Sequence, residues 1–308
     1  MKRLSRQTRK IKNFINEDIW KLELEEFSKA RARFLKYLKI LLITIRTFSA
    51  EKIGFQAVAL SFFSTMSVVP FIAIVFAITG GLGLADKLQE LLYGYFENST
   101  QIIDFVINAA RNIIDSTEGG GMGAISGLLF AWIVVWMMLS VERVFNNVWK
   151  VTTNRNIFKR LSYIIAMLLI APFVIMVFFS GTIFYSHVLE LLGLNSESLT
   201  IFKTVVAWII FGVIVTFTFS AMYKFIPNAK VNYGAALRAA IPAAIAFTVM
   251  NYLYLETQVL VTRLNAVYGV FAAVPLFMMW VNVGWNIILI GSEISYAFQR
   301  VENYNVED

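Results

Sequence analysis

Six long apolar segments dominate the chain, and polar or charged segments separate them. The apolar segments cover about 55–83, 122–145, 160–188, 201–225, 235–260 and 267–298. A helix rises about 1.5 Å per residue, so roughly 20 residues cross the ~30 Å hydrocarbon core of a bilayer. Each segment is long enough, and the pattern predicts an all-α, polytopic membrane helix bundle with six transmembrane helices over 51–300.

Two shorter regions have an amphipathic pattern. Over 1–50, apolar residues recur at roughly helical spacing among many basic residues. That is typical of a segment on the cytoplasmic leaflet, or on the protein's own cytoplasmic face. Over 84–118, two apolar stripes predict a pair of short helices on the outer face. Residues 301–308 are expected to form a cytoplasmic tail.

The basic residues fall almost entirely into alternate gaps between the apolar segments. Of the 27 Lys and Arg, 23 precede the first span, lie in the second and fourth gaps, or follow the last span. The other four are Lys87, Arg111, Lys203 and Arg263. Positive residues are retained on the cytoplasmic side of a membrane. The distribution therefore places both termini in the cytoplasm.

The composition agrees with a membrane protein and narrows the classes of function. Hydrophobic residues make up 58% of the chain and charged residues 15%, whereas a soluble domain is nearer one quarter charged. The pI of about 9.5 is explained by contact with anionic lipid headgroups, so no nucleic-acid partner is expected. Membrane lipids are the expected partners, and the sequence leaves a homo-oligomer open.

Catalytic and metal-binding patterns are not found in this sequence. There is no cysteine and one histidine, His187, so neither a thiolate nucleophile nor a histidine-rich metal cluster is available. No phosphate-binding loop of the G-x-x-x-x-G-K type and no G-x-S-x-G motif is present. We expect no enzyme activity, no catalytic residue, no metal and no cofactor.

Polar side chains within two of the spans are the candidates for a substrate pathway. They are Ser61, Ser64, Thr65, Asn282 and Asn286. The hydroxyls precede Pro70 and can satisfy carbonyls that a proline leaves free. The asparagines share one face of the last span. Polar groups in membranes usually face the bundle interior, so the alternative is hydrogen bonding between helices, without a cavity.

A second candidate is a charge cluster at the cytoplasmic ends of two spans. Glu142 and Arg143 end the second span, and Glu293 lies near the end of the sixth. Because the depths match, Arg143 is a candidate partner for Glu293 across the bundle. The alternative is that both charges extend separately to the interface.

Four stretches of the sequence carry a resemblance to a known family. They are AVALSFFSTMSVVPF at 57–71, SVERVFNNVWKV at 140–151 with NRNIFKRLSY after it, YKFIPNAKVNYGAALRAA at 223–240, and YGVFAAVPLFMMWVNVGWNIILIGSEISYA at 268–297. Together they resemble the YihY/BrkB family of bacterial inner-membrane proteins. The resemblance implies an all-helical multispan protein of the bacterial cytoplasmic (inner) membrane. The family has carried the labels ribonuclease BN, virulence factor and envelope transporter, and the resemblance assigns no functional residues.

These observations favour a transporter-like protein that moves or accommodates an amphiphilic envelope molecule such as a lipid. An ion-coupled transporter or antiporter is the first alternative. It usually needs a buried acidic residue, and the acidic residues here lie near span ends. A structural membrane protein that transports nothing is the second alternative.

Overall fold

The computed structural model describes residues 19–22, 27–95, 100–117, 121–153, 155–191, 200–268 and 270–302. Over these ranges the chain forms helices and no strand, which confirms the all-α fold. The helices are α2 (Ile19–Lys21), α3 (Lys29–Ala50), α4 (Ile53–Gly81), α5 (Ala85–Tyr95), α6 (Thr100–Thr117), α7 (Gly121–Val148), α8 (Ile157–Leu191), α9 (Thr200–Phe225), α10 (Tyr233–Tyr268) and α11 (Val270–Arg300). Residues 1–18 of the predicted amphipathic segment and 303–308 of the predicted tail lie outside the described residues.

Six helices are long and apolar enough to cross a membrane, as the hydropathy pattern predicts. They are α4, α7, α8, α9, α10 and α11. Each presents large apolar side chains at its surface, for example Phe62, Trp132, Leu169, Phe217, Leu253 and Met279. An aqueous surface would make such exposure unfavourable, whereas lipid chains solvate it. The exposed side chains therefore form the lipid-facing surface of an integral membrane protein.

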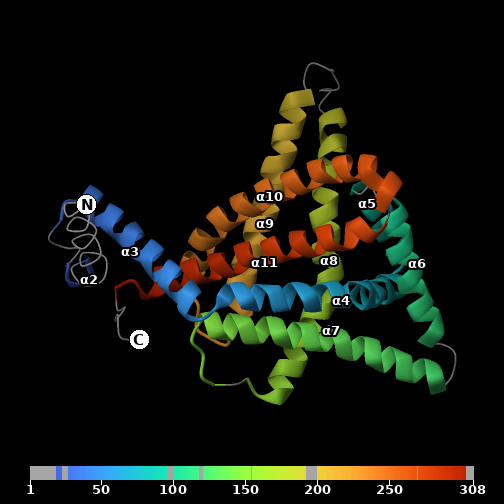
Figure 1. The fold of residues 1–308 in the computed structure, drawn as a ribbon, viewed down its shortest axis with the longest axis horizontal. Helices are drawn as coiled ribbons and strands as arrows, with labels where there is room; N and C mark the ends of the chain where they lie inside the picture. The colour runs from blue at the N-terminus through green and yellow to red at the C-terminus, as the bar shows by residue number, and fades with distance from the viewer. Residues whose placement is uncertain are drawn as a thin grey trace.

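The six long helices are not all aligned with one another. Figure 1 shows α4, α7 and α11 running side by side, whereas α8 and α9 run across them. Helix α11 packs against α10 on one side and against α4 on the other, and α4 in turn packs against α7. Helix α11, which carries Asn282, Asn286 and Glu293, thus lies between α4 and α10.

Small residues allow α9, α10 and α11 to approach one another closely. The face of α10 that packs inward is a row of buried alanines: Ala236, Ala239, Ala240, Ala243 and Ala244. Gly291 of α11 lies opposite this row and beneath the buried Tyr223 of α9. A Cβ atom at position 291 would lie 2.0 Å from the Tyr223 hydroxyl oxygen and 2.8 Å from the Ala243 Cβ. Only glycine fits this contact, and small residues serve the same purpose in other membrane helices.

The hydroxyls before Pro70 do not bond the carbonyl that the proline leaves free, contrary to the prediction from the sequence. Pro70 removes the hydrogen bond to the carbonyl of Met66, one turn earlier. The hydroxyls donate instead to carbonyls nearer the helix start: Ser61 to Val58 (2.7 Å), Thr65 to Ser61 (2.8 Å) and Ser67 to Ser64 (3.1 Å). The reason is geometric, because a serine or threonine hydroxyl in a helix reaches only the carbonyl three or four residues before it.

Helix α3 has one buried face and one exposed apolar face. Its buried residues Ile40 and Ile43 pack against Ala297 and Val301, at the end of α11. Lys39 lies on the same side, where burial lowers the pKa of its ammonium group and its Nζ donates to the Leu22 carbonyl (3.0 Å). The opposite face exposes the apolar stripe Phe34, Tyr37, Leu41 and Ile45. Two residues separate α3 from α4, and the second, Lys52, has a left-handed backbone (φ 50°).

The region between the first two spans forms two helices, as the amphipathic pattern predicts. Helices α5 and α6 pack their apolar faces onto the end of α4 through Leu88, Leu92, Ile103 and Ile107. Side-chain hydrogen bonds from Tyr93 to Asp104 and from Arg111 to Gln89 join the two helices. The pair therefore covers the end of α4 that lies away from α3.

The contact at Gly291 predicts a large effect of one added methyl group. Gly291→Ala is expected to lower the free energy of unfolding by about 1–3 kcal/mol, because Tyr223 and Ala243 must move to admit the Cβ. Thermal or denaturant unfolding of the purified protein in detergent measures this change. Gly80→Ala is the matched control, since no atom lies within 4 Å of a Cβ built there. Equal stability of the two variants would contradict the close contact.

Candidate functional site at the basic end of the helices

Hydrogen bonds gather several junctions of the chain at one end of the helices, which we call the basic end. It comprises the α3–α4 junction, the segment joining α7 to α8, the 226–232 loop joining α9 to α10, and the end of α11. The backbone N–H of Asn228 donates to Asn146 Oδ1 of α7 (2.7 Å), and Asn228 Nδ2 donates to the Thr153 carbonyl (3.1 Å). The basic residues of the second and fourth gaps that these segments carry, among them Lys150, Arg155 and Lys230, therefore share one end of the molecule.

The end of α11 holds the 226–232 loop from the other side. Gln299 Oε1 accepts a hydrogen bond from the Asn232 N–H (2.8 Å), and Gln299 Nε2 donates to the Lys230 carbonyl (2.9 Å). The Trp149 indole donates to Ser292 Oγ of α11 (3.3 Å). These bonds fix the loop between α7 and α11.

Glu293 is the most unusual group at this end. Its side chain is 0% exposed, and neither carboxylate oxygen accepts a hydrogen bond from any residue that the structure describes. The charged groups that act on it electrostatically are Glu51, at the α3–α4 junction, and Lys150, just after α7. A buried carboxylate without a hydrogen bond is costly, and such groups in membrane proteins mark functional sites.

Lys150 occupies a backbone position that normally favours glycine. Its φ of 51° lies in the left-handed region. The Lys150 N–H bonds the Asn147 carbonyl (2.9 Å) and the Val151 N–H bonds the Asn146 carbonyl (2.8 Å), which is the Schellman arrangement that ends a helix. Glycine adopts this conformation without cost, whereas a lysine is strained there. Strained residues cluster at functional sites, and this one supplies the positive charge that acts on Glu293.

The predicted pairing of Arg143 with Glu293 is wrong. Arg143 is exposed, Glu293 is fully buried, and the structure shows no ion pair between them. The charge pair that forms instead joins the buried Glu142 Oε2 to Arg160 Nε of α8 at 2.9 Å. Consecutive helical residues point about 100° apart, so Glu142 and Arg143 cannot both face the bundle interior. The carboxylate faces inward, and the guanidinium faces outward.

Comparing depths along the predicted spans did not identify Arg160 as a member of the charge cluster. It stands in the first turn of α8, three residues after Ile157, whereas Glu142 lies six residues before the end of α7. Which residue of α8 meets Glu142 depends on how the two helices cross, so the sequence alone does not identify Arg160 as its partner.

The polar residues predicted to line a pathway lie along the contact between α4 and α11, with different roles. The Trp285 indole donates to Ser64 Oγ across the two helices (2.9 Å). Asn286 Nδ2 donates to the Asn282 carbonyl (2.9 Å) and to Asn282 Oδ1 (3.3 Å), within α11. The Asn282 amide nitrogen is itself buried and donates to none of the described residues.

Ser61 and Thr65 are not part of this contact network. Both hydroxyls are bonded to carbonyls of their own helix, α4. The side chain of His187 is outside the described residues. Among the side chains that are described, no group of three His, Asp or Glu lies close enough to hold a metal ion.

A family comparison accounts for most of the chain. The sequence model of the family described as "Virulence factor BrkB" matches residues 44–308. The chain belongs to the BrkB family. The match includes α4 and every later helix, and it confirms the family that the four sequence stretches indicate. No solved structure matches the chain.

Named relatives of the chain are UPF0761 membrane proteins. One from Acinetobacter baylyi is 29% identical over 283 residues, which cover 88% of this chain and 64% of that protein. One from Vibrio vulnificus is 25% identical over 288 residues, covering 92% of this chain and 88% of that protein. A third, from Psychrobacter, is matched over only 45% of its length. The chain thus spans two thirds or less of some BrkB-family relatives, and these names state no activity.

The Glu142–Arg160 pair predicts an asymmetric response to mutation. Arg160→Gln is expected to destabilise the protein by about 1–3 kcal/mol, because it leaves a carboxylate buried without its counter-charge. Glu142→Gln should cost less, since it removes the buried charge itself. Arg143→Gln is the control and should change stability by less than about 0.5 kcal/mol. Unfolding in detergent compares the three, and a larger effect at Arg143 than at Arg160 would contradict the pairing.

Proposed function

We propose that this BrkB-family protein is a transporter-like protein of the bacterial cytoplasmic membrane that moves or accommodates an amphiphilic envelope molecule, a lipid. It is not an enzyme in this proposal, and it requires neither cofactor nor nucleic acid. In this proposal both termini lie in the cytoplasm, because most Lys and Arg precede the first span, lie in the second and fourth gaps, or follow the last span. A homo-oligomer is compatible with this function but not required.

The observation that carries the proposal is the spare hydrogen-bonding capacity of α11 where it faces α4. If the polar residues served only to join helices, their buried atoms would all be paired. The Trp285–Ser64 and Asn286–Asn282 bonds fit that simpler role. The Asn282 amide nitrogen and both Glu293 oxygens do not, because they are buried and lack partners among the described residues. Such groups are available to a polar headgroup or to water that accompanies it.

The position of these groups supports an amphiphile rather than a fully polar solute. Asn282 lies 11 residues, or about 16 Å of helix, before Glu293, so the spare groups extend from the membrane interior toward the basic end. The surrounding helices expose apolar side chains to lipid. A headgroup following α11 would therefore keep its chains in the bilayer, and the basic end would attract a headgroup that carries phosphate.

Lipid scrambling in proteoliposomes tests this function. Purified protein should move a labelled anionic phospholipid between leaflets, and Asn282→Leu should reduce the rate at least about fivefold by removing a polar group from the membrane interior. Ser162→Leu is the matched control, because Ser162 is an exposed polar residue of another span, α8. The control should retain the wild-type rate. Folded wild-type protein that scrambles nothing would refute the proposal.

The burial of Glu293 favours a second candidate function, ion-coupled transport. A carboxylate that is fully buried and lacks a hydrogen bond is the type of group that exchanges protons in transporters. If this is its role, proteoliposomes should dissipate an imposed pH gradient, and Glu293→Gln should abolish the dissipation. Glu90→Gln, which changes an exposed carboxylate of α5, is the control.

The two assays together separate three outcomes. If the protein dissipates the pH gradient but does not scramble lipid, ion-coupled transport at Glu293 would replace lipid movement as the proposed function. Scrambling without dissipation would leave Glu293 as a binding group for the headgroup. If protein shown to be folded neither scrambles lipid nor dissipates the pH gradient, a structural membrane protein that transports nothing would be favoured.

A further inference from the structure

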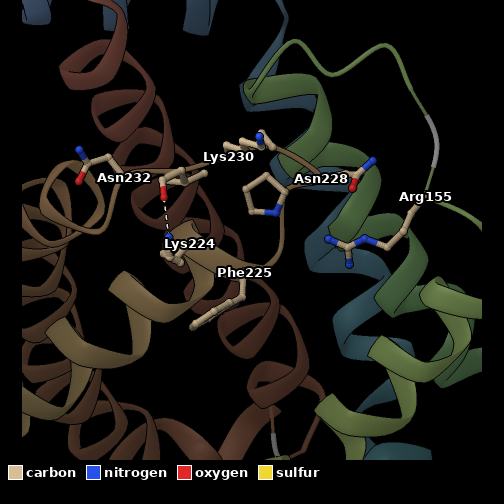
Figure 2. Close-up of a pocket in the computed structure, with 9 residues that line it drawn as sticks. Arg155, Lys224, Phe225, Asn228, Lys230 and Asn232 are labelled. Atoms are coloured by element: carbon tan, nitrogen blue, oxygen red, sulfur yellow. Dashed lines mark hydrogen bonds between the residues drawn. The ribbon is translucent and has the colours of Figure 1, made fainter.

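The 226–232 loop forms one wall of an open pocket at the basic end. The pocket has a volume of about 830 Å³ and is lined by Arg155, Lys224, Phe225, Lys230 and neighbouring residues of the loop. Figure 2 shows Arg155 reaching it from the α7–α8 side, while Lys224 and Lys230 come from the end of α9 and from the loop. Three side chains in the lining are basic, and none of the described lining residues is acidic.

The loop that holds these cations is held in place independently of any ligand. Its backbone and side chains bond to α7 and α11 through Asn228 and Asn232. The Lys224 ammonium donates to the Val231 carbonyl (2.7 Å), which closes the loop upon itself, as the dashed line in Figure 2 marks. An ammonium has three donors, so two remain for a ligand. Preorganised donors lose less entropy on binding than flexible ones.

Arg155 and Lys230 have no acidic partner in the part of the chain that the structure describes. The Arg155 guanidinium stacks over the Tyr163 ring, with its Cζ 4.5 Å from the ring centroid. Stacking fixes the plane of the guanidinium and leaves charge and donors to be shared with a ligand. Neither Arg155 nor Lys230 forms an ion pair with any described residue, and Lys230 is exposed. Three cations in one pocket, with no acidic side chain among the described residues that line it, are suited to a phosphate group.

Apolar neighbours distinguish a lipid from a free phosphate ion. Phe225, which lines the pocket, is 60% exposed. Ile157 and Phe158, in the first turn of α8, are 77% and 80% exposed. These are the ends of spans, where a lipid places its phosphate beside the protein and its chains along the helices. We propose that the pocket binds the phosphate group of an anionic membrane lipid through Arg155, Lys224 and Lys230.

This inference rests on the proposed function only in taking a membrane lipid as the ligand. It adds the chemical class of the headgroup, a phosphate diester with net negative charge, and a place where the headgroup is held. Binding at the pocket does not require movement across the membrane. The two claims can therefore fail separately.

Native mass spectrometry of the full chain in detergent tests the site, with phosphatidylglycerol as probe. The double variant Arg155→Gln/Lys230→Gln should weaken phosphatidylglycerol binding at least about tenfold, because two charge-assisted contacts are lost. Phosphatidylcholine, which has no net charge, should bind weakly and equally to wild type and variant. Arg143→Gln/Arg238→Gln is the matched control, since it removes two exposed positive charges that do not line the pocket. It should change binding less than about twofold.

The other outcomes distinguish the site, its ligand and the proposed function from one another. Equal losses in the pocket variant and the control would show attraction by the whole basic end and would overturn the site. Inorganic phosphate that binds with the same dependence on Arg155 and Lys230, while phosphatidylglycerol does not bind, would overturn the lipid as ligand. Should the double variant fail to fold, Lys230→Gln alone carries the test, with an expected loss of about threefold. Selective binding by a wild type that does not scramble lipid would uphold the pocket and refute the proposed function.

Discussion

The close contact among α9, α10 and α11 is the constraint on which the basic end depends. Because position 291 has no side chain, Tyr223 lies directly against α11, and the alanine row of α10 completes the contact. Helix α9 leads from Tyr223 into the 226–232 loop after only two more residues. The position of the loop, and hence of the cations it carries, therefore follows from a packing contact inside the bundle.

Hydropathy alone predicted six long apolar helices in the order in which they occur along the chain. The energetic reason is strong: an unpaired backbone group in hydrocarbon is so unfavourable that a long apolar segment must be a helix. Helices α9 and α11 begin and end within three residues of the predicted limits, whereas α10 continues to Tyr268, eight residues beyond its predicted end. The steep crossing of α8 and α9 could not be predicted, because apolar residues on every face specify membrane burial without specifying a direction of packing.

The candidate site was only partly predictable, and Glu142 and Arg143 show why. Depth along a helix can be counted from the sequence, and both residues were correctly placed near one end of the bundle. Rotation about the helix axis was not determined, and it decides which of two adjacent residues faces inward. The same limit applies to Ser64, whose partner Trp285 became evident only from the packing of α4 on α11. The left-handed backbone of Lys150 had no sequence signal, because glycine is the residue expected there.

The two-residue connection between α3 and α4 has a mechanical consequence. A helix whose apolar stripe is exposed responds to the lateral pressure and composition of the surface in which that stripe lies. Since only Glu51 and Lys52 separate α3 from α4, little slack is available to absorb a tilt of α3. Glu51 is also one of the two charges that act on Glu293. A tilt of α3 would therefore move Glu51 and change the electric field at a buried carboxylate.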